Sequence, residues 1–152
     1  MDRRKEQAEI ISQVMLADGI FSMWLKTEAS HTAKPGQFIS MYTNDGSKLL
    51  PRPISICEID SVKGRLRVVY RVTGENTGTE QFSRMQSGDT LSIIGPLGNG
   101  FPLEKAEGKN VFLMGGGIGI PPILELAKQV QCRKKTDCSR VSGCAYIFER
   151  RI

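Results

Sequence analysis

The chain has 152 residues, 39% hydrophobic and 24% charged, the ordinary mixture of a globular protein with one well-cored domain and part of another. No apolar run approaches the roughly 20 residues that span a bilayer, and the polar start lacks the apolar core of a secretion signal, so we expect a cytoplasmic protein without membrane contact. Most of the net charge of +5 lies in residues 131–152, which carry six basic side chains against two acidic ones. The remainder is nearly neutral, which argues against nucleic acid as a partner.

The first half of the chain has the pattern of short β-strands joined by turns. Alternating or compact apolar runs predict strands at residues 9–16, 20–26, 37–42, 54–59 and 65–72. Asp18 and Gly19 between the first two runs are a hairpin signal, and residues 44–47 and 60–64 are turn clusters. This organisation predicts a mainly β fold, a small antiparallel barrel or sandwich.

The periodicity changes at residues 78–85, where Thr79 is in position to cap a short helix with Phe82 and Met85 on its apolar face. Residues 90–94 predict another strand, and residues 95–101 form a glycine-rich loop. Glycines so closely spaced indicate either a tight connection or a close approach of the backbone to a ligand.

A second architecture begins near residue 105. Residues 109–114 form a continuous apolar run typical of a buried parallel strand, followed by a glycine turn at residues 115–119 and a helix over residues 123–130. Strand, glycine turn and helix form the first unit of an α/β nucleotide-binding domain, although a connection without a ligand is the alternative. We therefore divide the chain into a β-barrel domain (1–105), the start of an α/β domain (106–130) and an aberrant tail (131–152).

Residues 52–56, Arg-Pro-Ile-Ser-Ile, combine a guanidinium, a proline-fixed turn and a hydroxyl just ahead of a strand. The spacing lets Arg52 and Ser55 converge on one diphosphate, while Ile54 and Ile56 offer apolar edges and main-chain groups to a ring system. Taken alone, a surface cation at the rim of a barrel explains Arg52 equally well.

Together, these motifs and their order resemble the ferredoxin–NADP reductase superfamily. The matching segments are Arg-Pro-Ile-Ser at 52–55, Tyr-Arg-Val at 70–72, Gly-Thr at 78–79, Gly-Pro-Leu-Gly-Asn-Gly-Phe at 95–101 and Gly-Gly-Gly-Ile-Gly-Ile-Pro-Pro at 115–122. Among the members, residues 8–130 resemble the electron-transfer subunits of dihydroorotate dehydrogenase B.

The resemblance implies an FAD-binding barrel of the ferredoxin-reductase type. FAD would be contacted by Arg52, Pro53, Ile54, Ser55, Tyr70, Arg71 and Val72, with Gly78 and Thr79 on its pyrophosphate. NAD would face Gly115, Gly116, Gly117 and Gly119. Such subunits pass electrons from dihydroorotate, oxidised at FMN in a separate catalytic subunit, through an iron–sulfur cluster to FAD and then to NAD⁺.

The resemblance assigns no catalytic side chain and no metal ligand to this chain. The family's later strands and its cluster-binding cysteines are missing, so we expect an incomplete NAD site, no iron–sulfur cluster and less than full activity from the chain alone. Cys132, Cys138 and Cys144 match neither a CxxC zinc knuckle nor a common iron–sulfur spacing.

The tail departs from the family in charge, cysteine content and lack of a strand. We interpret residues 131–152 as the normal gene read in a shifted frame, with a divergent natural terminus as the alternative. Because one strand and one helix cannot cover a parallel sheet, we expect a folded barrel with a poorly ordered or aggregation-prone C-terminal third.

The sequence thus predicts an FAD-binding electron-transfer subunit of pyrimidine biosynthesis that works with a dihydroorotate dehydrogenase catalytic subunit. Two alternatives stay open. One is a subunit of a ferredoxin:NADP⁺ or sulfide oxidoreductase, and the other is a non-catalytic barrel that only binds a partner.

Overall fold

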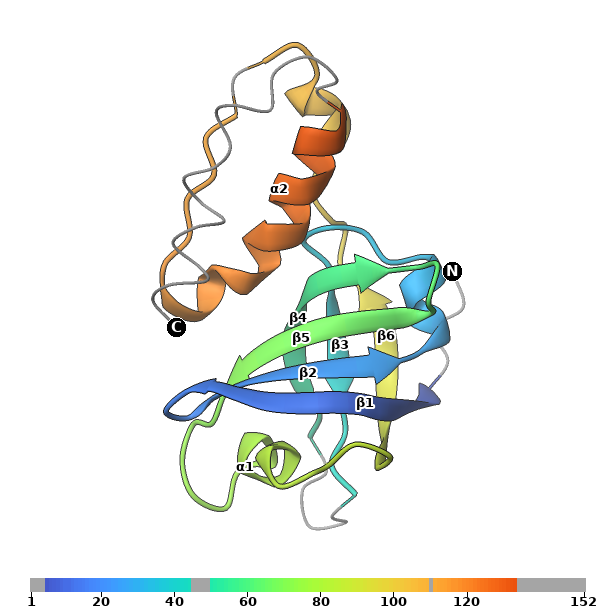
Figure 1. Cartoon of the computed structure of the whole chain (residues 1–152), viewed down its shortest axis with the longest axis vertical. Coiled ribbons are helices and arrows are strands. Elements are labelled where there is room, and N and C mark those ends of the chain that lie inside the picture. Colours follow the sequence, from blue (N-terminus) through green and yellow to red (C-terminus); the bar gives the residue numbers. More distant parts are fainter. Residues whose placement is uncertain (1–4, 45–49, 110, 134–152) are drawn as a thin grey trace.

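The computed structural model describes residues 5–44, 50–109 and 111–133. Within them, six strands close into an antiparallel barrel in the order β1-β2-β5-β4-β3-β6 (Figure 1). The strands are β1 Lys5–Ala17, β2 Ile20–Lys26, β3 Phe38–Met41, β4 Arg52–Asp60, β5 Arg65–Arg71 and β6 Thr90–Leu97. The helices are α1 Gly78–Ser83 and α2 Pro121–Arg133, with 3₁₀ turns η1 Glu28–His31, η2 Leu103–Ala106 and η3 Gly117–Gly119. The predicted mainly β barrel is confirmed.

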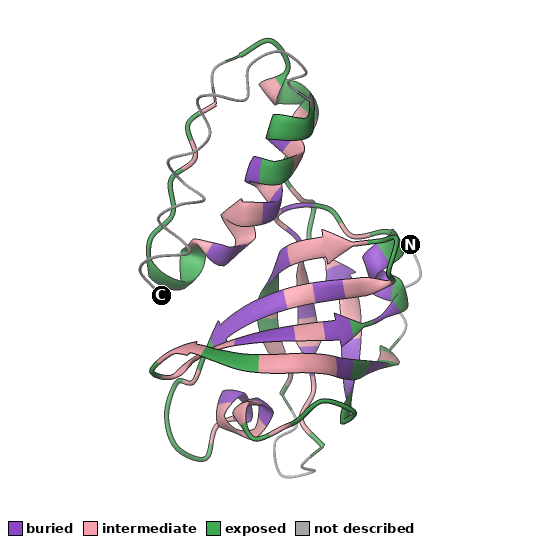
Figure 2. Ribbon diagram, viewed as in Figure 1, coloured by how far each residue is buried: buried purple, intermediate pink, exposed green. Residues whose placement is uncertain are grey.

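The core cluster contains buried residues from every strand of the barrel, and Figure 2 shows buried segments along the strands. The fully buried members include Ile10, Met23, Leu25, Ile39, Met41, Ile56, Leu66, Val68, Leu91 and Ile93. Each such side chain contributes about 1.5–3 kcal/mol through burial. Toward α1, Phe82 meets Tyr70 edge to face with ring centroids 6.2 Å apart, so α1 covers one end of the barrel.

β1 is longer than predicted and begins at Lys5 rather than at residue 9. Its first part pairs with β6, from Lys5 opposite Ile94, and its second part pairs with β2. Pairing with β6, which closes the barrel, therefore extends β1 into polar residues whose local sequence does not predict a strand. The predicted Asp18-Gly19 hairpin is confirmed, and Gly19 has a φ of 67°.

The prediction that Arg52 and Pro53 form a turn ahead of a strand is wrong, because both lie within β4, opposite Met41 and Ser40 of β3. Proline is tolerated there because this half of β4 pairs with β3 alone, so one edge of the strand needs no N–H.

The glycine-rich segment at residues 95–101 is a tight connection. β6 extends through its first residues to Leu97, and a Cβ on Gly95 would lie only 2.5 Å from Ile39 Cγ2. Gln37 Nε2 donates to the Gly98 carbonyl at 2.7 Å, and Phe101 N donates to the Pro35 carbonyl at 2.8 Å. The segment therefore packs on the chain entering β3, and of the two interpretations the structure favours this one.

The predicted strand at residues 109–114 is not formed. Residues 111–114 are not assigned to any strand, and Phe112 and Met114 are 90% and 87% exposed. A parallel strand needs neighbouring strands, and the described part of the chain places none beside it. α2 does form, beginning at Pro121 rather than at residue 123, since proline suits the first helical turn.

α2 packs against β4 and ends at Arg133, inside the segment assigned to the tail. Residues 134–152, with Cys138 and Cys144, lie outside the described residues, so the expectations for the tail and the domain divisions stay predictions. No described helix has both the length and the apolar character needed to cross a bilayer.

Candidate functional site

The barrel opens between the first half of β4 and the second half of β5. The ladder between these strands runs from Ile56 opposite Val68 to Asp60 opposite Arg65. Before Ile56, β4 pairs only with β3, and after Val68, β5 pairs only with β2. The first half of β4 and the end of β5 are therefore not paired with each other. A β-bulge at Cys57 marks the point where β4 changes neighbours. The predicted segments 52–55 and 70–72 therefore border a stretch of the barrel wall without strand pairing, which we call the opening.

On β4, the side chains of Pro53 and Ser55 are exposed, and those of Arg52 and Ile54 are half-buried. Ile54 also packs against the barrel core. Ile56 is fully buried, so the expectation that its side chain meets a ring is wrong. Outward and inward positions alternate along the strand, which turns Ser55 to solvent and Ile56 to the core.

On β5, Tyr70 is 1% exposed and Arg71 is exposed. The Tyr70 ring stacks on Phe21 with centroids 5.8 Å apart, and its hydroxyl donates to Gln13 Oε1 at 2.8 Å. Val72 packs against the core. In this segment only Arg71 can offer a side chain to the opening, whereas Tyr70 and Val72 can offer main-chain groups.

Arg52 lies against the backbone of Gly78. A Cβ on Gly78 would lie 3.0 Å from Arg52 Nε, 3.2 Å from Arg52 Cγ and 3.2 Å from Thr43 Cγ2. Glycine thus lets the start of α1 approach the start of β4 closely. The tertiary structure brings two of the predicted motifs together at this contact.

Thr77 caps α1, and the prediction that Thr79 does so is wrong. Thr77 Oγ1 accepts from Glu80 N at 3.2 Å, and the Glu80 carboxylate accepts from Asn76 N. The Thr-x-x-Glu spacing of a capping box was the signal available in the sequence. Thr79 is 4% exposed and accepts from Thr73 N at 3.2 Å, so it ties the loop after β5 to the helix.

The glycine turn lies next to the same part of the barrel. Gly115, Gly116, Gly117 and Gly119 are all exposed, and Gly117 has a φ of 53°. The turn folds back on itself, since Gly119 N donates to the Gly116 carbonyl at 3.0 Å. Ile120, which follows it, packs with Cys57 of β4 and Val69 of β5.

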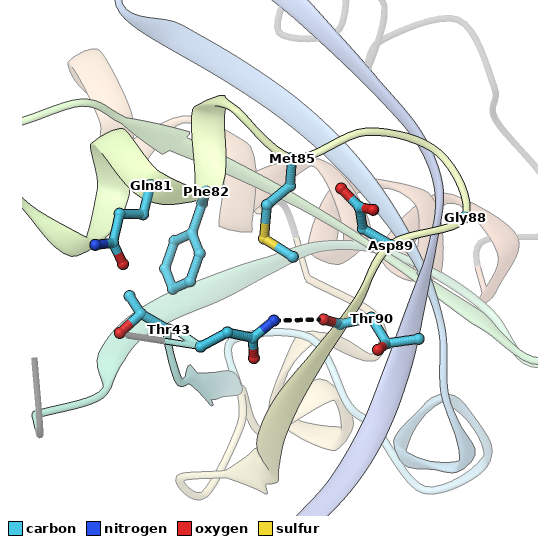
Figure 3. Close-up of a pocket in the computed structure, with 8 residues that line it drawn as sticks. Thr43, Gln81, Phe82, Met85, Gly88, Asp89 and Thr90 are labelled. Carbon is cyan, nitrogen blue, oxygen red and sulfur yellow. Dashed lines mark hydrogen bonds between the residues drawn. The ribbon is translucent and has the colours of Figure 1, made fainter. Parts of the chain in front are cut away.

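A hollow of about 630 Å³ lies between α1 and the ends of β3 and β6 (Figure 3). It is lined by Thr43, Asn44, Gln81, Phe82, Met85, Gly88, Asp89 and Thr90. Asn44 Nδ2 donates to the Thr90 carbonyl at 3.1 Å across its floor. Thr43, which also touches Gly78, links it to the Arg52 contact. Sequence reasoning missed this hollow because its walls meet only in the folded chain.

The described residues contain no group of three or more His, Cys, Asp or Glu side chains arranged to hold a metal ion. Cys57 is buried, and burial raises the pKa of its thiol to about 12, so it packs as a neutral side chain.

Residues 7–101 match the family described as "Oxidoreductase FAD-binding domain". The chain is 42% identical over 142 residues to the dihydroorotate dehydrogenase B (NAD(+)) electron transfer subunit of Streptococcus mutans, covering 93% of this chain and 54% of the relative. It is 40% identical over 132 residues to the subunit of the same name from Bacillus caldolyticus, covering 85% and 51%. The chain thus spans about half the length of these relatives.

Among solved structures, the chain resembles that of an NADH-dependent reduced ferredoxin–NADP oxidoreductase, with a TM-score of 0.74, 30% identity, and coverage of 84% of this chain and 45% of that one. It shares the fold of a ferredoxin NADP⁺ reductase from Neisseria gonorrhoeae with bound FAD and NADP, with a TM-score of 0.67, 19% identity, and coverage of 90% and 56%. The resemblance predicted from the sequence is confirmed, and the chain belongs to the oxidoreductase FAD-binding domain family.

Proposed function

We propose that this chain binds FAD in the opening between β4 and β5 and serves as the flavin-binding part of an electron-transfer subunit. The observation that carries the proposal is the convergence of Arg52, the start of α1 and the first half of β4, whose edge toward β5 has no strand partner. The family match supports FAD as the ligand.

The residues present fit a flavin dinucleotide. Gly78 lets the Arg52 side chain lie directly against the backbone at the start of α1, which places the guanidinium beside main-chain groups that suit a diphosphate. The exposed side chains of Ser55 and Pro53 and the main chain at Ile54 would line the flavin ring, with main-chain groups of residues 70–72 on its other side. Arg71 adds a second cation, and Thr79 orders the adjoining loop. The bound flavin would supply the redox chemistry, since it exchanges electrons singly or in pairs.

We further propose that Gly115, Gly116, Gly117 and Gly119 face NAD, as part of a site that this chain holds incompletely. The support is the position of the turn, because Ile120 packs on the strands that border the flavin opening. The relatives' printed names support a partnership with the catalytic subunit of dihydroorotate dehydrogenase, which would deliver electrons for transfer to NAD⁺. The cytoplasmic location stays a prediction. The absence of an iron–sulfur cluster from this chain stays a prediction.

A titration of the purified chain with FAD and with riboflavin tests the proposal. We expect a yellow protein whose flavin fluorescence changes on binding. Arg52→Ala should weaken FAD binding about tenfold to 100-fold, since a hydrogen bond to a charged group contributes about 1.5–3 kcal/mol. Riboflavin has no diphosphate, so its affinity should change little. A colourless protein that FAD cannot reconstitute would favour a non-catalytic, partner-binding barrel.

The structural similarity at 30% identity favours one second candidate, a subunit of a ferredoxin:NADP⁺ oxidoreductase. Co-purification from a host expressing both candidate partners separates the two functions. Recovery with a dihydroorotate-oxidising FMN protein supports the first, and recovery with a ferredoxin-dependent partner supports the second.

A further inference from the structure

Helix α2 covers an edge of β4 that the strand ladder leaves open. Beyond Ile56, β4 pairs with β5 alone. At this open edge, Ile59 N donates to Glu125 Oε2 at 3.0 Å, and Glu125 Oε1 accepts from Gln129 Nε2 at 2.9 Å. Glu125 is only 5% exposed. A nearly buried carboxylate therefore takes the place of the missing strand partner.

A network of charges makes a second connection between α2 and the barrel. Lys128 of α2 pairs with Glu58 of β4, and Glu58 also pairs with Arg67 of β5. The side chains of Glu58 and Arg67 are 14% and 19% exposed, so solvent screens this pair weakly. Burial opposes ionisation of Glu58, but hydrogen bonds from Lys128 and Arg67 outweigh it and lower the pKa of this carboxyl.

The third connection is apolar. Ile120 and Leu124 pack with Cys57 of β4 and Val69 of β5. Ile120 directly follows the glycine turn, and Leu124 and Glu125 lie one helical turn further on. The contact between α2 and β4 therefore also fixes where the turn ends.

β4 connects the flavin opening to helix α2. Its first half borders the flavin opening, and its second half holds α2 through Ile59. We propose that Glu125 is a positioning residue, which through the Ile59 N–H holds the turn at residues 115–119 in a fixed place relative to the flavin-binding half of β4.

This inference rests on the proposed function, because it concerns the alignment of a nicotinamide dinucleotide on the turn with a flavin beside β4. Hydride exchange requires the two rings to lie in close contact. A displacement of about 1 Å can lower such a rate roughly 100-fold, so a contact remote from both rings can control it.

The test is a distance measurement on the full chain with spin labels. One label is attached to Cys132, which is exposed. The other is attached to the cysteine that Ser61→Cys introduces in the exposed turn after β4. Cys138→Ser and Cys144→Ser remove two further thiols, which leaves the buried Cys57 as the other cysteine of the parent. Glu125→Leu deletes the acceptor for the Ile59 N–H, whereas Glu125→Gln keeps a carbonyl oxygen there. Gln131→Leu, at an exposed position of the same helix, is the matched control.

We expect one narrow distance distribution in the parent, in Gln131→Leu and in Glu125→Gln, and a broad one in Glu125→Leu. FAD content should be equal in all four. Lys128→Ala changes a half-exposed side chain and should broaden the distribution in part, so it keeps the test valid should Glu125→Leu not fold. A narrow distribution in both Glu125→Leu and Lys128→Ala would overturn the inference.

Stopped-flow reduction of the bound FAD by NADH gives the chemical readout. The rate at saturating NADH should fall at least tenfold in Glu125→Leu and recover in Glu125→Gln, at unchanged FAD affinity. Equal rates in the parent and Glu125→Leu would contradict a positioning role. A parent that binds no FAD contradicts the proposed flavin site, and a parent whose bound FAD is not reduced by NADH contradicts the proposed placement of NAD at the glycine turn. In both cases the distances still decide whether Glu125 holds α2.

Discussion

The hydroxyl of Tyr70 donates to Gln13 Oε1 at 2.8 Å, and the amide of the same Gln13 side chain holds the end of α1. Gln13 Nε2 lies within 2.8–3.2 Å of the carbonyls of Phe82, Ser83 and Met85. A single side chain of β1 therefore joins the buried phenol on β5 to the last turn of α1, whose first residue contacts Arg52.

Gln13→Leu is expected to lower the free energy of unfolding by about 1–3 kcal/mol, because it leaves the Tyr70 hydroxyl and the α1 carbonyls without this partner. Urea unfolding measures the loss, and amide exchange should accelerate in α1. Tyr70→Phe breaks only the hydroxyl contact and should cost about 1 kcal/mol. Equal stability of Gln13→Leu and the parent would show that water replaces the amide without cost.

Gly78→Val should weaken FAD binding by roughly ten to 100-fold, because the added carbons occupy the space now held by the Arg52 side chain. Riboflavin affinity should stay close to that of the parent. Gly116→Ala is the control, since a Cβ there meets nothing within 4 Å. Parallel losses of FAD and riboflavin affinity would point to a general distortion rather than a displaced Arg52.

Gly95→Ala is expected to destabilise the barrel by about 1–3 kcal/mol, since its Cβ would lie 2.5 Å from Cγ2 of the buried Ile39. The measurement is urea unfolding, with Gly116→Ala as the tolerated control. In the double variant with Ile39→Ala, the clashing methyl group is gone. Its cost should therefore be smaller than the sum of the two single costs, and simple additivity would contradict the contact.

Thiol reactivity should differ sharply between Cys57 and Cys132. Cys57 is fully buried and burial raises its pKa to about 12, whereas Cys132 is exposed. Because the folded-state pKa of Cys57 lies above its unfolded value, its neutral form favours folding below about pH 9, and this contribution declines as pH rises from there. Mass spectrometry after brief alkylation at pH 8 should find Cys132 modified and Cys57 modified only in denaturant. Rapid native labelling of Cys57 would contradict its placement beneath α2.

Glu58→Gln should reduce the dependence of the free energy of unfolding on pH in the acidic range. The pKa of Glu58 is lowered from its usual value near 4.5, so its pairing with Lys128 and Arg67 stabilises the fold above that pH. The contribution is lost as pH falls below 4.5 through the folded-state pKa. Urea unfolding between pH 3 and pH 7 measures the slope, and Glu9→Gln at an exposed position should leave it unchanged. An unaltered slope in Glu58→Gln would mean that the ion pairs add no net stability.

The strand pattern, the Asp18-Gly19 hairpin and the family motifs were readable from the sequence because each depends on neighbours in the chain. Alternation places residues on two faces, and a turn dipeptide needs no distant partner. The same local logic failed for residues 109–114, whose apolar run forms no strand without neighbouring strands. It also assigned Arg52 and Pro53 to a turn, because local sequence does not reveal that β3 pairs with them.

The amino-acid sequence alone was enough to predict a β-barrel and the flavin-family motifs, since periodicity and motif order can be read directly along the chain. Three features are visible only in the folded chain: β4 before Ile56 does not pair with β5 after Val68, Gly78 lies on Arg52, and Glu125 reaches Ile59. These contacts join segments far apart in the chain. Barrel closure and helix packing, rather than local preference, bring their atoms within bonding distance.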